Sequence, residues 1–158
     1  MILDAENQFS DSQAITTSAV GTNVIDLTTA RAIGGGEPVV VMFNVEVDAD
    51  QTSGDEDYTF DVEYATNTAQ TTGRQLMGRR VFESGTPTAP AQDADLLVGG
   101  FIFTIPVPAS DLAEAGQFIG VRYVTAGTSP ILTASAHLVP QSFVQKYNTY
   151  QTNSTITT

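Results

Sequence analysis

The densest group of potential ligands in the sequence is the acidic stretch "DADQTSGDED", residues Asp48–Asp57. Carboxylate oxygens are the ligands that Ca²⁺ prefers. An EF-hand loop has Gly at its sixth position and Glu at its twelfth, but counted from the first aspartate these positions hold Ser53 and Thr59. We therefore interpret the stretch as a solvated hairpin loop whose carboxylates face solvent. The alternative is a Ca²⁺ site, for which the candidate ligands are Asp48, Asp50, Asp55 and Asp57.

The sequence contains only weak matches to known catalytic motifs. The single histidine, His137, lies in "ILTASAHLV" on the face that also carries Thr133 and Ser135. A Ser–His–Asp triad needs a base held between nucleophile and carboxylate, and no nucleophile elbow marks either hydroxyl. Paired carboxylates, the machinery of glycosidases, arise by chance in an acidic chain. The "GGGEP" stretch continues into a strand and so offers no helix N-terminus to a phosphate. We predict no enzymatic activity.

Three of the six positive charges, Arg74, Arg79 and Arg80, lie within the stretch "RQLMGRR". One interpretation is local pairing with the acidic first part of the chain, which is worth under about 1 kcal/mol per exposed pair. The other is a docking patch for an acidic partner. Both interpretations stay open on sequence alone.

The charge distribution excludes some partners. The chain of 158 residues has 18 acidic and 6 basic residues, and the whole excess of −12 lies in residues 1–63. Nucleic-acid binding depends largely on Lys and Arg neutralising phosphates, so we expect no nucleic-acid partner. An anionic membrane surface is disfavoured for the same reason. Without cysteine, neither disulfides nor thiolate metal sites are available.

The sequence predicts that these residues lie on or between short strands, which are separated by turns rich in Gly, Pro and Asp. "YTFDVEY" (Tyr58–Tyr64) alternates fully, as a strand with one buried face requires, and Val39–Val47 alternates after an apolar start. Further strands are predicted at Asn23–Leu27, Gln75–Ser84, Leu96–Ile105, Phe118–Thr125 and Ile131–Val139. Only "PASDLAEAGQ" resembles a helical turn. This pattern predicts an all-β sandwich or barrel, and it does not separate a jelly roll from an immunoglobulin-like sandwich.

Both ends lie outside this strand pattern. We predict an N-terminal arm over residues 1–21, a β-sandwich domain over residues 22–140 and a polar C-terminal arm over residues 141–158. The ends contain apolar residues, among them Phe9, Ile15 and Phe143, for which a solvated tail has little use. At least one end is therefore interpreted as an ordered arm on a neighbouring subunit, the alternative being two frayed termini.

The opening of the chain carries a family resemblance. "MILDAENQFSDSQAITTSAVGTNVIDL", followed by "ARAIGGGEPVVV", resembles the start of the capsid cement (decoration) proteins of tailed bacteriophages. The matching elements are Phe9–Asp11, Gln13–Thr16, Ser18–Ala19, Thr22–Leu27 and Gly34–Pro38. The resemblance is strong over about the first 40 residues, weakens to a general similarity in "FIGVRYVTAGTSPILTASAHLV", and does not extend to the middle of the chain.

This resemblance implies a jelly-roll-type β-sandwich with extended arms, made in the host cytoplasm and bound to the outer surface of the virion. There it would bridge and stabilise major capsid protein subunits, without enzymatic activity or cofactor. It also implies self-association, with a homodimer as first choice and a trimer as second. The alternative function is a virion-surface module that binds host glycans or another host receptor.

The acidic loop is a poor docking surface because buried unpaired charges are costly. Docking to the capsid is therefore assigned to the N-terminal arm and the arginines. The expected docking residues are Ile2, Leu3, Phe9, Ile15, Arg74, Arg79 and Arg80.

We expect deletion of residues 1–15 to leave a folded protein that no longer binds capsids. Neutralising the carboxylates of the acidic loop should leave binding nearly unchanged. Binding of both variants to undecorated heads checks this assignment, and the reverse result would contradict it.

Overall fold

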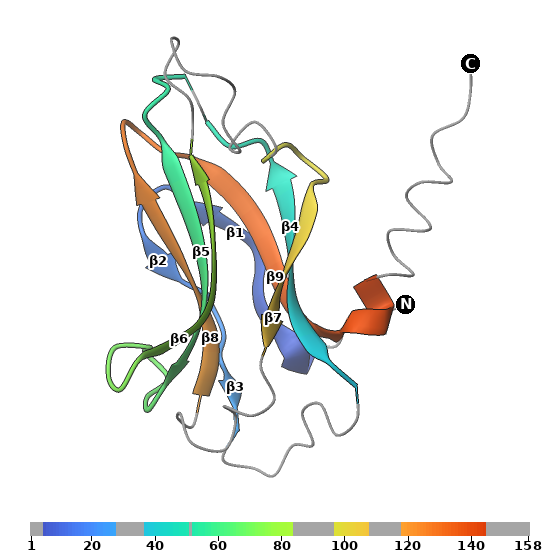
Figure 1. Ribbon diagram of the computed structural model, residues 1–158. Helices are drawn as coiled ribbons and strands as arrows, with labels where there is room; N and C mark the ends of the chain where they lie inside the picture. Colours follow the sequence, from blue (N-terminus) through green and yellow to red (C-terminus); the bar gives the residue numbers. More distant parts are fainter. Residues whose placement is uncertain (1–4, 28–36, 51, 84–96, 108–117, 145–158) are drawn as a thin grey trace, which may run out of the picture.

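Two antiparallel β-sheets pack face to face in the computed structural model, which describes residues 5–27, 37–50, 52–83, 97–107 and 118–144 (Figure 1). The first sheet has the order β1-β9-β4-β7, with bounds Gln8–Ile15, Leu132–Pro140, Val39–Val47 and Ile102–Val107. The second has the order β2-β8-β5-β6, with bounds Ala19–Val20, Phe118–Ala126, Asp57–Ala65 and Gln75–Glu83. The short strand β3 (Ile25–Asp26) also pairs with β8, and a 3₁₀ turn, η1 (Ala5–Asn7), precedes β1.

The chain passes repeatedly between the two sheets. Among the described strands, only β2 and β3, which both pair with β8, and the β5–β6 hairpin are consecutive strands of one sheet. The all-β sandwich predicted from the sequence is confirmed. Its assignment as a jelly roll stays a prediction, which the alternation of consecutive strands between the sheets supports.

Most predicted strands are found close to their predicted bounds. β4 has the predicted bounds, β6 and β8 differ by one residue at one end, and β5 and β9 differ by one residue at both ends. β7 begins later than predicted, at Ile102, because the residues before it form a turn in which Gly100 has a φ of 88° and its N–H bonds to the Val45 carbonyl oxygen. The stretch "PASDLAEAGQ", residues 108–117, lies outside the described residues.

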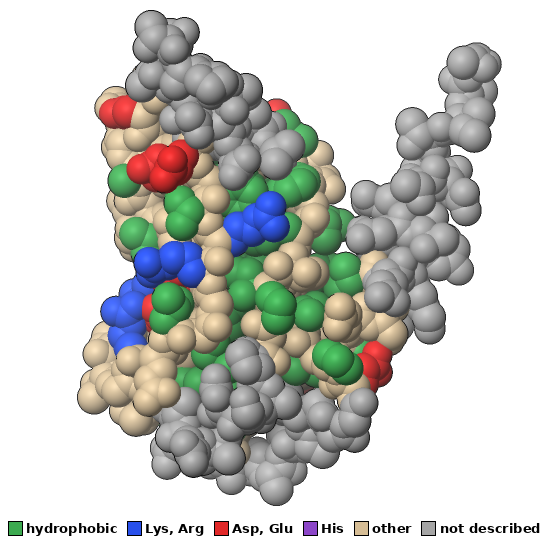
Figure 2. Space-filling model, in the orientation of Figure 1, with side chains coloured by type: hydrophobic (Ala, Val, Ile, Leu, Met, Phe, Trp, Pro, Cys, Tyr) green, Lys and Arg blue, Asp and Glu red, His purple; other side chains and the backbone are tan. Residues whose placement is uncertain are grey.

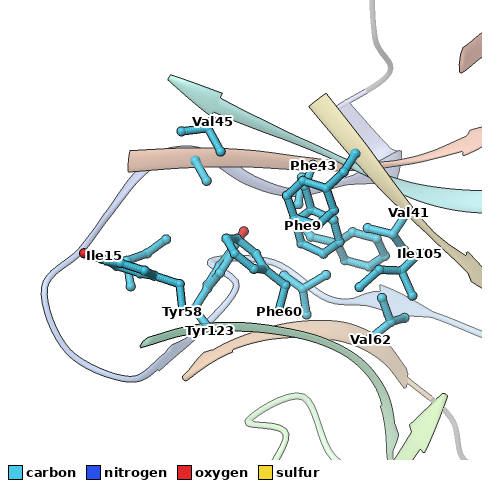
Figure 3. Close-up of a cluster of buried hydrophobic side chains, with 14 of the residues drawn as sticks. Phe9, Ile15, Val41, Phe43, Val45, Tyr58, Phe60, Val62, Ile105 and Tyr123 are labelled. Carbon is cyan, nitrogen blue, oxygen red and sulfur yellow. The ribbon is translucent and has the colours of Figure 1, made fainter. Parts of the chain in front are cut away.

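The predicted N-terminal arm is wrong for residues 8–15, which form β1 and pair with β9, and for residues 19–20, which form β2 and pair with β8. Phe9 and Ile15 are fully buried between the two sheets, Phe9 beside Phe43 and Ile15 beside Tyr58 (Figure 3). The Ser10 hydroxyl, also buried, shares a 2.6 Å hydrogen bond with the Tyr123 hydroxyl. The sandwich therefore begins at β1 rather than at residue 22, because its core needs these side chains.

The start of the predicted C-terminal arm packs on its own domain. Residues 141–144 form one helical turn, and Phe143 and Val144 pack against a small apolar cluster of Val40, Met42 and Val139 on the outer face of the first sheet. The Gln141 N–H bonds to the Pro38 carbonyl oxygen at 2.9 Å. The remainder of the predicted arm, residues 145–158, lies outside the described residues.

No helix in the described part of the chain has both the length and the apolar character needed to cross a membrane.

Truncation of Phe9 tests whether β1 belongs to the cooperative core. We expect Phe9→Ala to lower the free energy of unfolding by about 3–5 kcal/mol, because it removes a fully buried ring and leaves a cavity. The control Ile131→Ala, at a side chain that is 48% exposed, should have a much smaller effect, of about 0.5 kcal/mol. Urea unfolding measures both, and equal effects would place Phe9 outside the core.

For the same reason, deletion of residues 1–15 is now expected to unfold the domain. This replaces the expectation that the deletion variant folds.

Candidate functional site

Two edge strands, β6 of the second sheet and β7 of the first, lie side by side at one open edge of the sandwich (Figure 1). Gly78 permits this close approach, because a Cβ at that position would lie 2.3 Å from Cγ2 of Ile105. In the described part of the chain, neither strand has a partner on its outer side. A row of unpaired backbone groups on an edge strand is a template for pairing with another chain. We call this surface the β6–β7 edge.

Arg80 covers the aromatic core at this edge. Its guanidinium lies 5.1 Å from the ring centroid of Phe82 and 5.7 Å from that of Phe103. A cation over an aromatic face gains about 0.5–1 kcal/mol at exposed sites. The open end of the core is thus shielded by a positive charge.

Arg79, next along β6, points to the outer face of the second sheet. Its Nε and Nη2 donate to Oδ1 and Oδ2 of Asp61, each at 2.7 Å. The Asp61 side chain is buried, while that of Arg79 is 51% exposed. A bidentate guanidinium–carboxylate pair of this kind is among the stronger charged contacts.

Arg74 makes a similar contact with Glu63, which is buried on β5. Arg74 donates to both carboxylate oxygens of Glu63, and Arg122 Nε donates to Oε2 at 3.1 Å. Burial opposes ionisation of Glu63, but the hydrogen bonds from Arg74 and Arg122 outweigh it and hold the pKa of this carboxyl below its ordinary value of 4.5. Local pairing of Arg74 and Arg79, one of the two interpretations of the sequence, is therefore what the structure contains.

Apolar side chains flank these charges on the outer face of β6. Leu76 is 52% exposed and Val81 is 39% exposed, on either side of Arg79. Figure 2 shows this edge, with blue arginine and green apolar side chains gathered over β6 and β7. The sequence pattern predicts a strand over Leu76 and Val81 but does not indicate that these two side chains are exposed. The edge combines exposed apolar surface with positive charge and unpaired backbone groups.

Not all of the residues expected to dock are available. Phe9 and Ile15 are fully buried in the core, so they cannot act as exposed anchors, and that part of the prediction is wrong. Ile2 and Leu3 lie outside the described residues. Of the expected docking residues that the structure describes, the three arginines remain at the surface, all on or beside β6.

The carboxylates of the acidic loop bind the chain's own backbone and hydroxyl groups. Asp48 accepts from the Gly99 N–H at 2.6 Å and Asp50 from the Thr52 N–H at 3.0 Å. Asp55 accepts from both the N–H and the hydroxyl of Thr128, at 3.1 and 3.0 Å.

Glu56 departs from the expectation that the loop's carboxylates face solvent. It is fully buried and accepts from the N–H groups of Ser53 and Asp55, at 3.0 and 3.2 Å. Across the described residues, no three side chains of the Asp, Glu, His or Cys types come together as a metal site would need. We assign the loop a structural role.

His137 lies on the outer face of the first sheet, as predicted, but it is 93% covered by neighbouring groups. The Ser135 hydroxyl donates to Glu46 rather than to His137. The arrangement is not that of a Ser–His–Asp triad, in which the histidine is the base for the hydroxyl.

One family model, described as Bbp16, matches residues 9–137, well over half of the chain. No curated protein sequence matches the chain. The match begins in β1 and ends in β9, and Gln8 pairs with His137 in the register of these two strands. The matched unit is therefore the sandwich with β1 included.

The Glu63 carboxylate gives a pH test of the buried ion pairs. The pKa of Glu63 is lowered in the folded state. Its contribution to the free energy of unfolding is therefore fully present above pH 4.5 and is lost as the pH falls through the lowered pKa. Glu63→Gln should therefore cost about 1–3 kcal/mol at neutral pH, and the difference from wild type should shrink on acidification.

Unfolding free energies measured from neutral to acidic pH check this. The exposed Glu83→Gln is the control and should follow the wild type throughout. A difference for Glu63→Gln that is independent of pH would show that the carboxylate charge is not what stabilises the contact.

Proposed function

We propose that this chain, which belongs to the Bbp16 family, is a cement (decoration) protein of a tailed-phage head. It is a virion structural protein made in the host cytoplasm. It binds the outer surface of the capsid and stabilises contacts between major capsid protein subunits. The observation that carries the proposal is the resemblance of the opening, residues 1–40, to proteins of this kind.

The position in the fold of the residues that carry the resemblance supports this proposal. They form β1, whose side chains fill the core, together with β2 and β3. The resemblance therefore concerns the part of the chain that builds the sandwich, and it does not rest on a detachable tail. A shared opening of this type is best explained by a shared fold.

We place capsid docking at the β6–β7 edge. Leu76 and Val81 offer exposed apolar surface. Arg80 offers positive charge in a chain whose net charge is −12, and Arg79 stays 51% exposed while paired with Asp61. A fitting partner surface has apolar groups flanked by carboxylates, because complementary charge directs association and excludes wrong partners. Edge strands also allow the partner to add a strand through backbone hydrogen bonds.

The same edge is suited to self-association, and a dimer or trimer remains part of the proposal. In a dimer, a two-fold contact would bring the β6–β7 edges of two copies together, whereas in a trimer this edge would contact a different surface of the next copy. Capsid docking and self-association through one edge exclude each other within a single copy. The docking variants below therefore also report on the oligomer.

Binding to purified heads that lack this chain tests the proposal. Wild-type protein should bind them and raise the temperature at which they burst. The double variant Leu76→Ser/Val81→Ser should bind at least about tenfold more weakly, the equivalent of ~1.4 kcal/mol. The control Val47→Ser, at another exposed apolar side chain, should bind like wild type.

Failure of the wild-type protein to bind or stabilise heads would contradict the proposed function. If the wild type binds and the double variant binds equally well, the function stands and the β6–β7 edge is the wrong docking surface. Loss of host adsorption with intact, stable heads would instead favour the receptor-binding alternative.

A further inference from the structure

A second surface lies on the outer face of the first sheet, where a hollow of about 310 Å³ opens over β1, β9, β4 and β7. Its polar lining comes from Gln8, Asp11, Asn44, Glu46, Ser135 and His137. The strand register brings these residues together, since His137 lies opposite both Gln8 of β1 and Met42 of β4, and Ser135 lies opposite Asn44. We call this surface the acidic hollow.

Two carboxylates line the acidic hollow without a cation. Within the described part of the chain, neither Asp11 nor Glu46 forms an ion pair. One oxygen of Glu46 accepts a hydrogen bond from the Ser135 hydroxyl, which is itself fixed by the Ser12 N–H at 3.0 Å. This second bond holds the serine, and through it the glutamate, in place. The hollow therefore presents a positioned negative charge.

His137 adds an independent sign that the hollow accommodates a ligand. It is only 7% exposed, and its buried Nδ1 has no hydrogen-bond partner in the described structure. Buried polar atoms are nearly always paired, and an exception calls for an explanation. Burial also lowers the pKa of His137, against the pull of Asp11 and Glu46, so the imidazole is neutral at neutral pH and can accept a hydrogen bond.

We propose that the acidic hollow binds an arginine side chain of a partner protein. The guanidinium would donate to Asp11 and Glu46, in the charge-assisted geometry that arginine forms with carboxylates. Its aliphatic stem would pack on Met42 and Ile102, which complete the lining. A divalent metal ion is a poorer occupant, because the described Asp, Glu and His side chains do not converge on one point.

This inference does not depend on the proposed function, because it concerns a different face from the β6–β7 edge and any arginine-bearing partner would serve. The inference also predicts how the affinity of the acidic hollow for arginine changes with pH. His137 faces the hollow from β9, Asp11 from β1 and Glu46 from β4, and β7 contributes no titratable group. Protonation of His137 would add a like charge beside the bound guanidinium, so affinity should fall as the pH is lowered through the pKa of His137.

The single histidine makes a direct test possible. The imidazole NMR signals of His137 are followed while acetyl-arginine amide is added to the full-length protein, with acetyl-citrulline amide as the neutral control of the same shape. We expect a saturable shift with the arginine compound only. The pKa of His137 should also be lower in its presence, because a bound cation disfavours the imidazolium.

Substitutions of the two carboxylates test whether arginine binds in the acidic hollow. Asp11→Asn and Glu46→Gln should each weaken the arginine response severalfold, whereas Glu83→Gln, at an exposed carboxylate elsewhere, should not change it. The absence of a saturable shift, an equal response to citrulline, or an equal loss in Glu83→Gln would overturn the inference. Since no heads are used, its failure is distinguishable from failure of the proposed function.

Discussion

The structure depends on the packing of Phe60, on β5, against rings from four other strands. Its ring centroid lies 5.3 Å from that of Phe43 and 4.9 Å from that of Phe103, both in the opposite sheet, and 5.7 and 5.6 Å from those of Phe82 and Tyr123 in its own. All four contacts are edge-to-face, a geometry that aromatic pairs prefer. Because these rings lie on β4, β6, β7 and β8, one cluster joins both sheets and holds both strands of the β6–β7 edge in fixed positions.

Each outer face of the sandwich follows from this arrangement. With the rings directed inward, alternation sends the carboxylates of Asp61 and Glu63 to the outer face of the second sheet, where arginines pair with them. The outer face of the first sheet is divided. One part is apolar and covered by the helical turn at residues 141–144, and the other is the acidic hollow. The two surfaces proposed for binding, one basic and apolar and the other acidic, therefore lie on different parts of one rigid framework.

The sequence predicted the strands whose alternation is regular and missed β1 and the two-residue β2. Val39–Val47 and Tyr58–Tyr64 keep a period of two, and both were found with little error. β1 contains two register shifts against β9 and a positive φ of 44° at Ser12, so its apolar residues do not alternate. Ser10 is polar although it is fully buried, so the polar and apolar pattern of this stretch does not indicate a strand. Phe9 and Ile15 were therefore interpreted as anchors of an arm although they are core.

The candidate sites were less predictable than the fold because they depend on contacts between distant residues. The alternation of the strands predicted that the side chains of Asp61, Glu63 and His137 point outward. It did not predict that neighbouring groups would cover each of them. The pairing of Arg79 with Asp61 was one of two open interpretations, and the strand register decides it. The hollow itself needs Asp11 beside Glu46 and His137, a grouping that appears only when β1 pairs with β9 and β9 with β4.

We propose this chain as a structural component of the head surface, and its copy number in the virion is the sharpest test of that role. Gel densitometry of purified virions gives the ratio of this chain to the major capsid protein. A cement protein should be present in a number comparable to the major capsid protein. A few copies per particle, or none, would contradict the account.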